Sequence, residues 1–292
     1  MSSPLDATTA RRMWAVGEPV HALGYFAPES RSAWEDAGLR GFWRGYFATR
    51  AAPLGPAGAP VVTAAFYNFA PSFVARSVPE IWTMAAPADA WTARLDGMDA
   101  ALRATLDDPS VLEGAEVAEA ADLARRAAEA SPAAGRTFFA AHLDLDWPAA
   151  PHLVLWQALT LLREFRGDGH NAALLAANVD GCQCHVLAAA CAGPPREMLQ
   201  AARGWSDDEW DAAEAGLTER GLLVPGQADE ATEAGRALRD SIELCTDQTD
   251  LAPWRALGVD ATERLHGLLR PLAKAVAESG TLPAVNPIGI RW

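Results

Sequence analysis

Basic side chains are scarce in this 292-residue sequence, which has 24 Lys and Arg against 38 Asp and Glu and a net charge of −14 with neutral histidines. A field of that sign repels nucleic acid and anionic lipid over about a Debye length. Binding to nucleic acid is therefore not expected unless the chain carries a local basic patch.

Cysteine and long apolar runs are also scarce. Four irregularly placed cysteines are too few for a disulfide scaffold and are typical of a reducing cytosol. The first residues show no basic stretch followed by an apolar one, so no secretory signal is expected. No apolar run approaches the ~20 residues of a membrane span. These features predict a cytoplasmic protein with no membrane partner.

Cofactor motifs are missing as well. The sequence has no Gly-x-Gly-x-x-Gly after a strand, no Walker loop and no Gly-x-Ser-x-Gly elbow. The segment Cys182-Gln183-Cys184-His185 has zinc-type ligands, but on a helix residues 182 and 184 point about 200° apart and cannot chelate one ion. No cofactor and no metal are therefore predicted. A haem held by one histidine, such as His21 or His170, stays open as an alternative.

The composition that is present favours packed helices. Half of the residues are hydrophobic, and Gly and Pro fall mostly between apolar stretches of helical period. Asp6 is a suitable N-cap for the first helix, with Pro19 near its end or at a kink. Further helices are expected over residues 30–37, 39–49, 88–106, 113–130, 132–143 and 260–278. Residues 61–69 fit either a strand or a helix.

The middle of the chain contains a long apolar helix with two glycines near its end. We expect a helix over residues 150–165, a break at Gly167-Asp168-Gly169, and a new helix over residues 170–178. His170 would then open a helix, where the positive end of the helix dipole disfavours the imidazolium.

Residues 206–238 follow the order of a winged helix. Ser206 with Glu209 forms a capping box, and the helix that it starts should end at Gly221. Residues 222–224 are expected to form a short strand, 225–227 a turn, and 231 onward another helix. Helix, hairpin and helix in this order are typical of winged helices of the MarR type.

Several longer stretches support a family resemblance. They are residues 163–170, 172–177, 205–210 and 232–238, the tail 286–289, and the N-terminal segments 18–22 and 24–26. Together they resemble an actinobacterial helix-turn-helix family sometimes labelled SalK-like. The resemblance implies a winged helix but no particular activity, because a fold does not fix function. By analogy with winged-helix relatives, it also implies a homodimer through terminal helices.

The resemblance implies that residues 205–223 form the helix that would enter a DNA groove. That segment carries six acids against Arg220 alone. Lys and Arg supply most of the affinity for duplex DNA, and the expected wing, residues 225–230, has no basic residue either. We therefore expect the winged helix to be a degenerate scaffold.

His170 and His21 are the leading catalytic candidates. Near His170, Glu164 could serve as a base, Arg166 as an anion clamp and Asp168 as an orienting carboxylate. The alternative is a structural network in which Asp168 caps a helix, Arg166 pairs with an acid and His170 is a core histidine. For His21, the alternative is a plain surface histidine.

Candidate ligand-binding residues cluster in two segments and beside His170. Tyr25 and Phe26 follow His21 and fit an aromatic-lined pocket. Tyr67, Asn68 and Arg76 add polar groups to an apolar segment, for which the alternative is a buried turn with a paired arginine. Glu164 completes the predicted ligand set.

These observations predict a mainly α protein. A helical lobe (1–149) would pack on a degenerate MarR-like winged-helix lobe with a C-terminal helix and tail (150–292). The predicted function is small-molecule binding, as an enzyme of specialised metabolism that uses general acid/base chemistry on a hydrophobic or aromatic compound. A non-catalytic ligand sensor or a winged-helix transcriptional regulator is the alternative.

Overall fold

The computed structural model describes residues 5–289 and is almost entirely helical, which confirms the mainly α prediction. The elements are α1 (Ala7–Phe26), α2 (Pro28–Asp36), α3 (Phe42–Ala51), α4 (Ala59–Phe66), α5 (Pro71–Ala75), α6 (Ile81–Met84), α7 (Pro87–Thr105), α8 (Ala115–Glu129), α9 (Thr137–Leu143), α10 (Pro151–Ala176), α11 (Gln183–Ala190), α12 (Arg196–Arg203), α13 (Asp207–Glu219), β1 (Leu223–Val224), β2 (Gln227–Ala231), α14 (Glu233–Thr249), α15 (Ala252–Leu257) and α16 (Val259–Glu278). Among these described helices, none is both long and apolar enough to cross a membrane.

Local sequence signals set several helix ends. The Asp6 carboxylate accepts a hydrogen bond from the Thr9 N–H at 3.1 Å and begins α1. α1 continues past Pro19 as far as Phe26, although an interior proline removes one backbone hydrogen bond and crowds the preceding turn. His21, Tyr25 and Phe26 therefore lie on one helix, so Pro19 does not lie near its end. Residues 59–66 form α4, which settles the choice between strand and helix for that segment.

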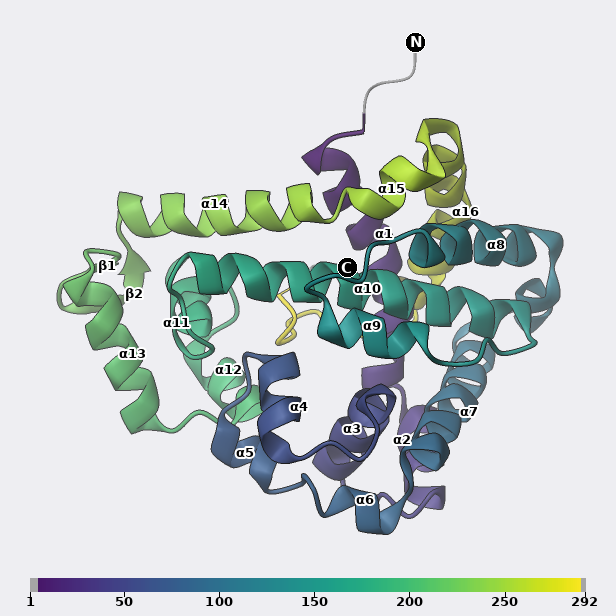
Figure 1. Cartoon of the computed structure of the whole chain (residues 1–292), viewed down its shortest axis with the longest axis horizontal. Helices are drawn as coiled ribbons and strands as arrows, with labels where there is room; N and C mark the ends of the chain where they lie inside the picture. The colour runs from purple at the N-terminus through teal and green to yellow at the C-terminus, as the bar shows by residue number, and fades with distance from the viewer. Residues whose placement is uncertain (1–4, 290–292) are drawn as a thin grey trace.

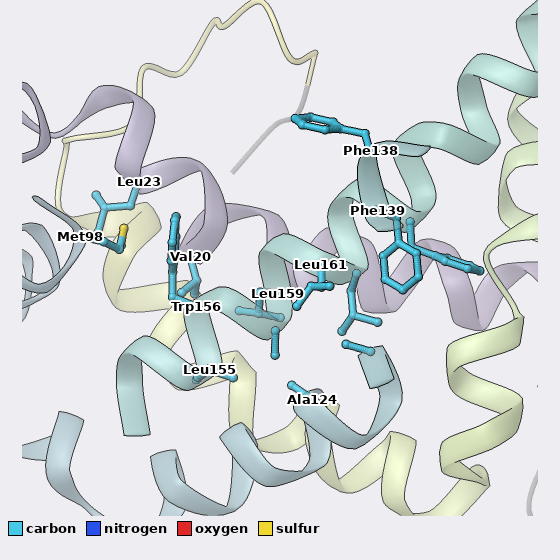
Figure 2. Packing of buried hydrophobic residues seen from close by; sticks show 14 of the residues in the cluster. Val20, Leu23, Met98, Ala124, Phe138, Phe139, Leu155, Trp156, Leu159 and Leu161 are labelled. Atoms are coloured by element: carbon cyan, nitrogen blue, oxygen red, sulfur yellow. The ribbon is translucent and has the colours of Figure 1, made fainter. Parts of the chain in front are cut away.

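α10 crosses the middle of the molecule, and the other helices are arranged around it (Figure 1). α1, α8, α9 and α14 pack along α10, and α16 packs against both α1 and α8. The main hydrophobic core lies between these helices. Figure 2 shows Val20 and Leu23 of α1, Met98 of α7 and Trp156 of α10 within it. The same core includes residues from α15 and α16, so its members run from Ala10 to Leu282. The expected division at 149/150 stays a prediction.

A smaller unit with its own core lies at one end of α10 (Figure 1). α12, a turn at residues 204–206 and α13 form the helix-turn-helix, and β1 pairs antiparallel with β2 as a short wing. Trp210 and Leu217 of α13 are buried in this second core. The capping box at Ser206 is confirmed, because its hydroxyl accepts from the Glu209 N–H and Glu209 accepts from the Ser206 N–H. No helix is predicted from the sequence at 196–203, so α12 is a helix that only the structure shows.

The predicted break in α10 is wrong, since the helix is continuous from Pro151 to Ala176. Its glycines serve close packing instead. A Cβ on Gly169 would lie 2.8 Å from both Arg136 Nη1 and Thr249 Oγ1, closer than atoms can approach. Glycine at 169 therefore lets the guanidinium of Arg136 lie against the helix. His170 lies inside α10, so the argument from a helix N-terminus does not apply to it.

Candidate functional site

A cavity of about 300 Å³ lies between the helical body and the helix-turn-helix unit. Its walls come from α1, α3, α4, α10 and α12, and residues 287–288 of the tail close one side. Seven aromatic side chains form most of the apolar lining: Tyr25, Phe26, Phe42, Trp43, Tyr46, Phe66 and Phe69. A second hollow of about 450 Å³ shares Asn68, His170, Pro287 and Ile288 with it.

The aromatic stripe of α3 explains much of this wall. Phe42, Trp43 and Tyr46 line the cavity, while Phe47 is completely buried in the main core behind them. Arg50 follows one turn later, with its guanidinium carbon 4.2 Å from the centre of the Phe66 ring. One helix therefore supplies the cavity with both apolar surface and a positive charge.

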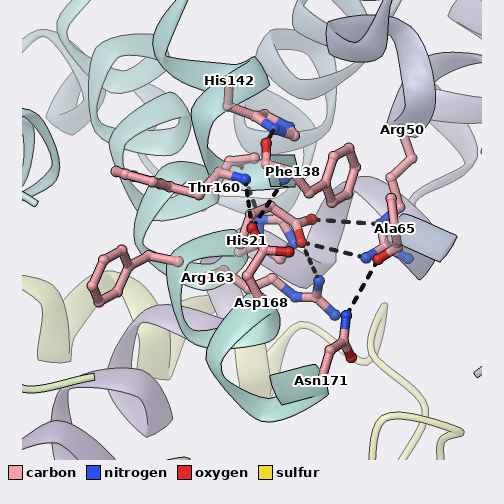
Figure 3. Close-up of polar contacts among 12 residues, drawn as sticks. His21, Arg50, Ala65, Phe138, His142, Thr160, Arg163, Asp168 and Asn171 are labelled. Carbon is pink, nitrogen blue, oxygen red and sulfur yellow. Dashed lines mark hydrogen bonds and ion pairs between the residues drawn. The ribbon is translucent and has the colours of Figure 1, made fainter. Parts of the chain in front are cut away.

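Glu164 of α10 is the central acid of the cavity. Its carboxylate lies 2.6 Å from Arg163 Nη1 and 3.4 Å from Arg50 Nη2. Figure 3 labels the side chains of Arg163 and Arg50. Burial alone would raise the pKa of Glu164, but Arg163 and Arg50 together hold it below its ordinary value. Glu164 is therefore ionised near neutral pH and cannot act as a proton donor there.

His170 lines the cavity from the next turns of α10. The Thr246 hydroxyl donates to the Ile242 carbonyl at 2.8 Å, so it accepts from His170 Nδ1 at 2.9 Å. This assigns the proton of the neutral ring to Nδ1 and leaves Nε2 as the basic nitrogen. Burial lowers the pKa of His170, which keeps the ring neutral at pH 7.

Asp168 also lines the cavity, but one of its carboxylate oxygens accepts hydrogen bonds from the protein backbone. Oδ2 accepts from the backbone N–H groups of Phe138 and Phe139 at 3.0 and 2.9 Å, so it caps α9 from another helix. Burial raises the pKa of Asp168 against these hydrogen bonds. The cap proposed as the structural alternative is therefore present, although Asp168 caps α9 and not the helix to which it belongs.

His21 lies behind the cavity wall and is 1% exposed. Thr160 donates to the Trp156 carbonyl and so accepts from His21 Nδ1 at 3.1 Å, which leaves Nε2 to accept from the Tyr25 hydroxyl at 2.9 Å. Burial lowers the pKa of His21 well below its ordinary range. His21 reaches the cavity only through Tyr25, so the structure does not bring His21 and His170 face to face.

Arg166 does not line this cavity. It pairs with Asp247 at 2.7 Å and with Asp250 at 3.3 Å, and its guanidinium carbon lies 4.9 Å from the Trp14 ring. Together with His21 it lines a separate void of about 20 Å³, which has room for about one water molecule. This geometry matches the structural alternative, in which Arg166 pairs with interior acids.

Of the other predicted ligand residues, one lines the cavity and two do not. Asn68 lines the cavity, and its carbonyl accepts from His185 Nε2 at 3.0 Å and Trp205 Nε1 at 3.1 Å. The Tyr67 hydroxyl donates to the Val179 carbonyl at 2.6 Å, and Tyr67 is not a lining residue. Arg76 is exposed beside the Phe73 ring and also lies outside the cavity.

Three arginines that line the cavity were not predicted from the sequence: Arg50, Arg163 and Arg203. Arg50 continues the spacing of the aromatic stripe of α3, and Arg163 lies two turns before His170 on α10, so helical spacing alone could have indicated both. Arg203 ends α12, a helix that the sequence analysis did not predict, and no local signal indicated it.

The wing and the helix-turn-helix define the class of protein. A family model described as a helix-turn-helix family matches residues 10–283, which is almost the whole chain. The protein therefore belongs to this helix-turn-helix family. No curated protein and no solved structure matches the chain.

Proposed function

We propose that the protein binds a small, mainly apolar organic molecule in the cavity and acts as a ligand sensor. The observation that carries this proposal is an aromatic cavity of about 300 Å³ at the junction with the helix-turn-helix unit. That volume lies at the lower end of the ~300–1,000 Å³ found for small-molecule sites, which also combine apolar walls with a few polar groups.

The junction gives the helix-turn-helix a direct contact with such a ligand. Ala202 and Arg203 of α12 line the cavity together with Asn68. Across the same junction, the Ala70 N–H donates to the Arg203 carbonyl at 2.9 Å, and Trp205 donates to the Asn68 carbonyl. A molecule that contacts Asn68 and Arg203 therefore touches both sides of the junction.

A second candidate function is acid/base catalysis in the same cavity. His170 favours it, because its neutral ring lines the cavity and leaves Nε2 as a base. The predicted catalytic roles of His21, Asp168 and Arg166 belong to this version, in which Asp168 lines the cavity, His21 acts through Tyr25 and Arg166 lies outside the cavity. Substrate turnover detected by mass spectrometry would support catalysis, and loss of that turnover in His170→Ala would assign the base.

Four finer predictions accompany the proposal. They are SalK-like membership, cytoplasmic location, a role in specialised metabolism and a homodimer. The transcriptional-regulator alternative draws on the family match.

The test is direct binding to the full chain. Aromatic probes are titrated while tryptophan fluorescence is followed, because Trp43 lines the cavity. We expect saturable binding that Ala65→Phe reduces at least ten-fold, since Ala65 also lines the cavity and a larger side chain fills it. Arg76→Ala is the matched control outside the cavity and should bind like the unmodified chain. Equal binding by Ala65→Phe would contradict the proposal.

A further inference from the structure

Arg203 is a partly buried cation without an acidic partner among the described residues. Its Nη1 donates to the Ala202 carbonyl at 3.1 Å and its Nη2 to the Pro287 carbonyl at 3.1 Å. Its Nε is shielded from solvent and has no hydrogen-bond partner. A buried donor without an acceptor is unfavourable, so Arg203 has an unfilled need for an acceptor.

The charges around the cavity do not supply that acceptor. Arg50 and Arg163 both pair with Glu164, so two guanidinium groups share one carboxylate. Asp168 uses Oδ2 to cap α9. With Arg203, three arginines and two acids line the cavity, which gives it a positive balance in a chain whose net charge is −14.

The positive charge balance of the cavity also decides between cationic and anionic ligands, both of which aromatic walls can accept. Aromatic rings can hold a quaternary ammonium group by cation–π attraction. Here Arg203 already lies 4.7 Å from the Phe69 ring centre, and Arg50 already lies over Phe66. These rings are therefore occupied by the protein's own cations, which would repel a cationic ligand.

We propose that the cavity selects small aromatic carboxylates, with the ring held between the aromatic walls and the carboxylate bound by Arg203. This inference rests on the proposed function and adds the chemical class of the ligand. Arginine suits this role because its planar donors match the two oxygens of a carboxylate. Nη1 and Nη2 each carry two N–H groups and each uses one on a backbone carbonyl, so each keeps a donor for the carboxylate. Because Arg203 is the last residue of α12, the carboxylate would bind to the helix-turn-helix itself.

The test compares ligands that differ only in charge. Benzoate and 2-naphthoate, the neutral amides benzamide and 2-naphthamide, and the cation 2-naphthylmethylammonium are titrated into the full chain at pH 7.5 by calorimetry. We expect at least one carboxylate to bind ten-fold or more tightly than its amide, and the cation to show no binding.

Variants assign the preference to Arg203. Arg203→Gln should reduce carboxylate affinity at least ten-fold and leave amide affinity within about two-fold, so that the preference disappears. Arg203→Lys keeps the charge but lacks the planar pair of donors, and it should show an intermediate preference. Arg76→Gln, outside the cavity, should keep the full preference. Far-UV circular dichroism checks that each variant keeps its helices.

The outcomes separate the two proposals. Amides that bind as tightly as carboxylates would overturn the ligand class while supporting a small-molecule site. A carboxylate preference that persists in Arg203→Gln would overturn the role of Arg203. Absence of binding by every probe would contradict both the ligand class and the proposed function. The charge series on the unmodified chain keeps the ligand class testable even if Arg203→Gln fails to fold.

Discussion

Glu18 of α1 is an acid whose pKa is shifted by burial. It is 2% exposed and accepts a hydrogen bond from Trp14 Nε1 at 3.1 Å. Burial raises its pKa to about 7, against the opposing effect of Arg163. Asp250 behaves similarly, because burial raises its pKa to about 7 although Arg166 opposes the shift. Both acids therefore titrate near neutral pH in the folded protein.

Glu18→Gln should change how stability depends on pH. The folded-state pKa of Glu18 lies above the ordinary value of 4.5, so the folded chain binds this proton more tightly than the unfolded chain. Its contribution is complete below about pH 4.5 and is lost as the pH rises through 7. Glutamine does not titrate. Between pH 5 and pH 8, the free energy of unfolding of the native chain should therefore fall relative to Glu18→Gln by roughly 1–3 kcal/mol.

Urea denaturation at several pH values measures this difference. Glu219→Gln, which changes an exposed glutamate on α13, is the matched control and should show a difference that does not depend on pH. A constant difference between the native chain and Glu18→Gln across the range would show that Glu18 does not titrate there.

Apart from Asn68, which lies in the loop after α4, the predicted residues that line the cavity share a helix with a candidate histidine. Tyr25 and Phe26 follow His21 on α1, and Glu164 shares α10 with His170. Arg203 shares no local pattern with these residues, because α12 joins the cavity through tertiary packing. The structural role of Arg166 was equally hidden from local patterns, because its partners Asp247 and Asp250 lie more than 80 positions away in the sequence.

Among the elements, α10 contributes most to both the core and the cavity. It carries Trp156 in the core and Glu164, Gly167 and His170 along the cavity. Its two glycines have different surroundings. A Cβ on Gly167 would have no neighbour nearer than 3.5 Å, whereas on Gly169 it would meet Arg136 and Thr249 at 2.8 Å. Replacing each glycine by alanine therefore separates the effect of helix propensity on stability from the effect of packing.

Gly167→Ala and Gly169→Ala should have opposite effects on stability. Alanine at 167 has room and favours the helix, so the free energy of unfolding should rise by about 0.5–1 kcal/mol. Because Gly167 lines the cavity, aromatic probes should bind this variant more weakly. Alanine at 169 should displace Arg136, which also donates to the Phe165 carbonyl, and should lower stability by about 1–3 kcal/mol.

Denaturant unfolding of the two variants provides the comparison, and the native chain is the reference for both. A Gly169→Ala variant at least as stable as Gly167→Ala would show that Arg136 moves aside without cost.

Local signals predicted element ends better than element continuity. The caps at Asp6 and Ser206 were predicted because a capping box involves only neighbouring residues. The break in α10 was predicted wrongly, because whether a glycine ends a helix depends on what packs against it. Here that neighbour is Arg136, 33 positions before Gly169 and on a different element. α12 was not predicted, because its N-cap is Pro195, which has no side-chain hydrogen bond to mark the start of the helix.

For the molecule as a whole, net charge weighs against a DNA-binding role. α13 exposes Asp207, Asp208 and Asp211, and Arg196 is engaged by Asp207 at 3.0 Å and by Asp211 at 2.9 Å. Phosphate contacts require free cations, and duplex affinity falls as they are neutralised. The prediction that nucleic acid is not a partner therefore has a physical basis in the surface of α13.

We expect duplex DNA to bind weakly. In fluorescence anisotropy at about 50 mM salt, the dissociation constant for a random duplex should exceed about 10 µM. Asp207→Asn combined with Asp211→Asn removes two negative charges and two of the three acids that Arg196 contacts, leaving Glu214, and should strengthen binding several-fold. The matched control is Asp122→Asn with Glu129→Gln on α8, which releases Arg126 and Arg125 by the same charge change far along the chain. Tight, salt-sensitive binding by the native chain would instead support a regulator.

Pro287 and Ile288 line the aromatic cavity and also the larger hollow beside it, so the two spaces have a common partition. The hydrogen bond from Arg203 to the Pro287 carbonyl ties this partition to α12, so a movement of α12 would carry the partition toward one of the two spaces. Filling one space would then shrink or enlarge the other.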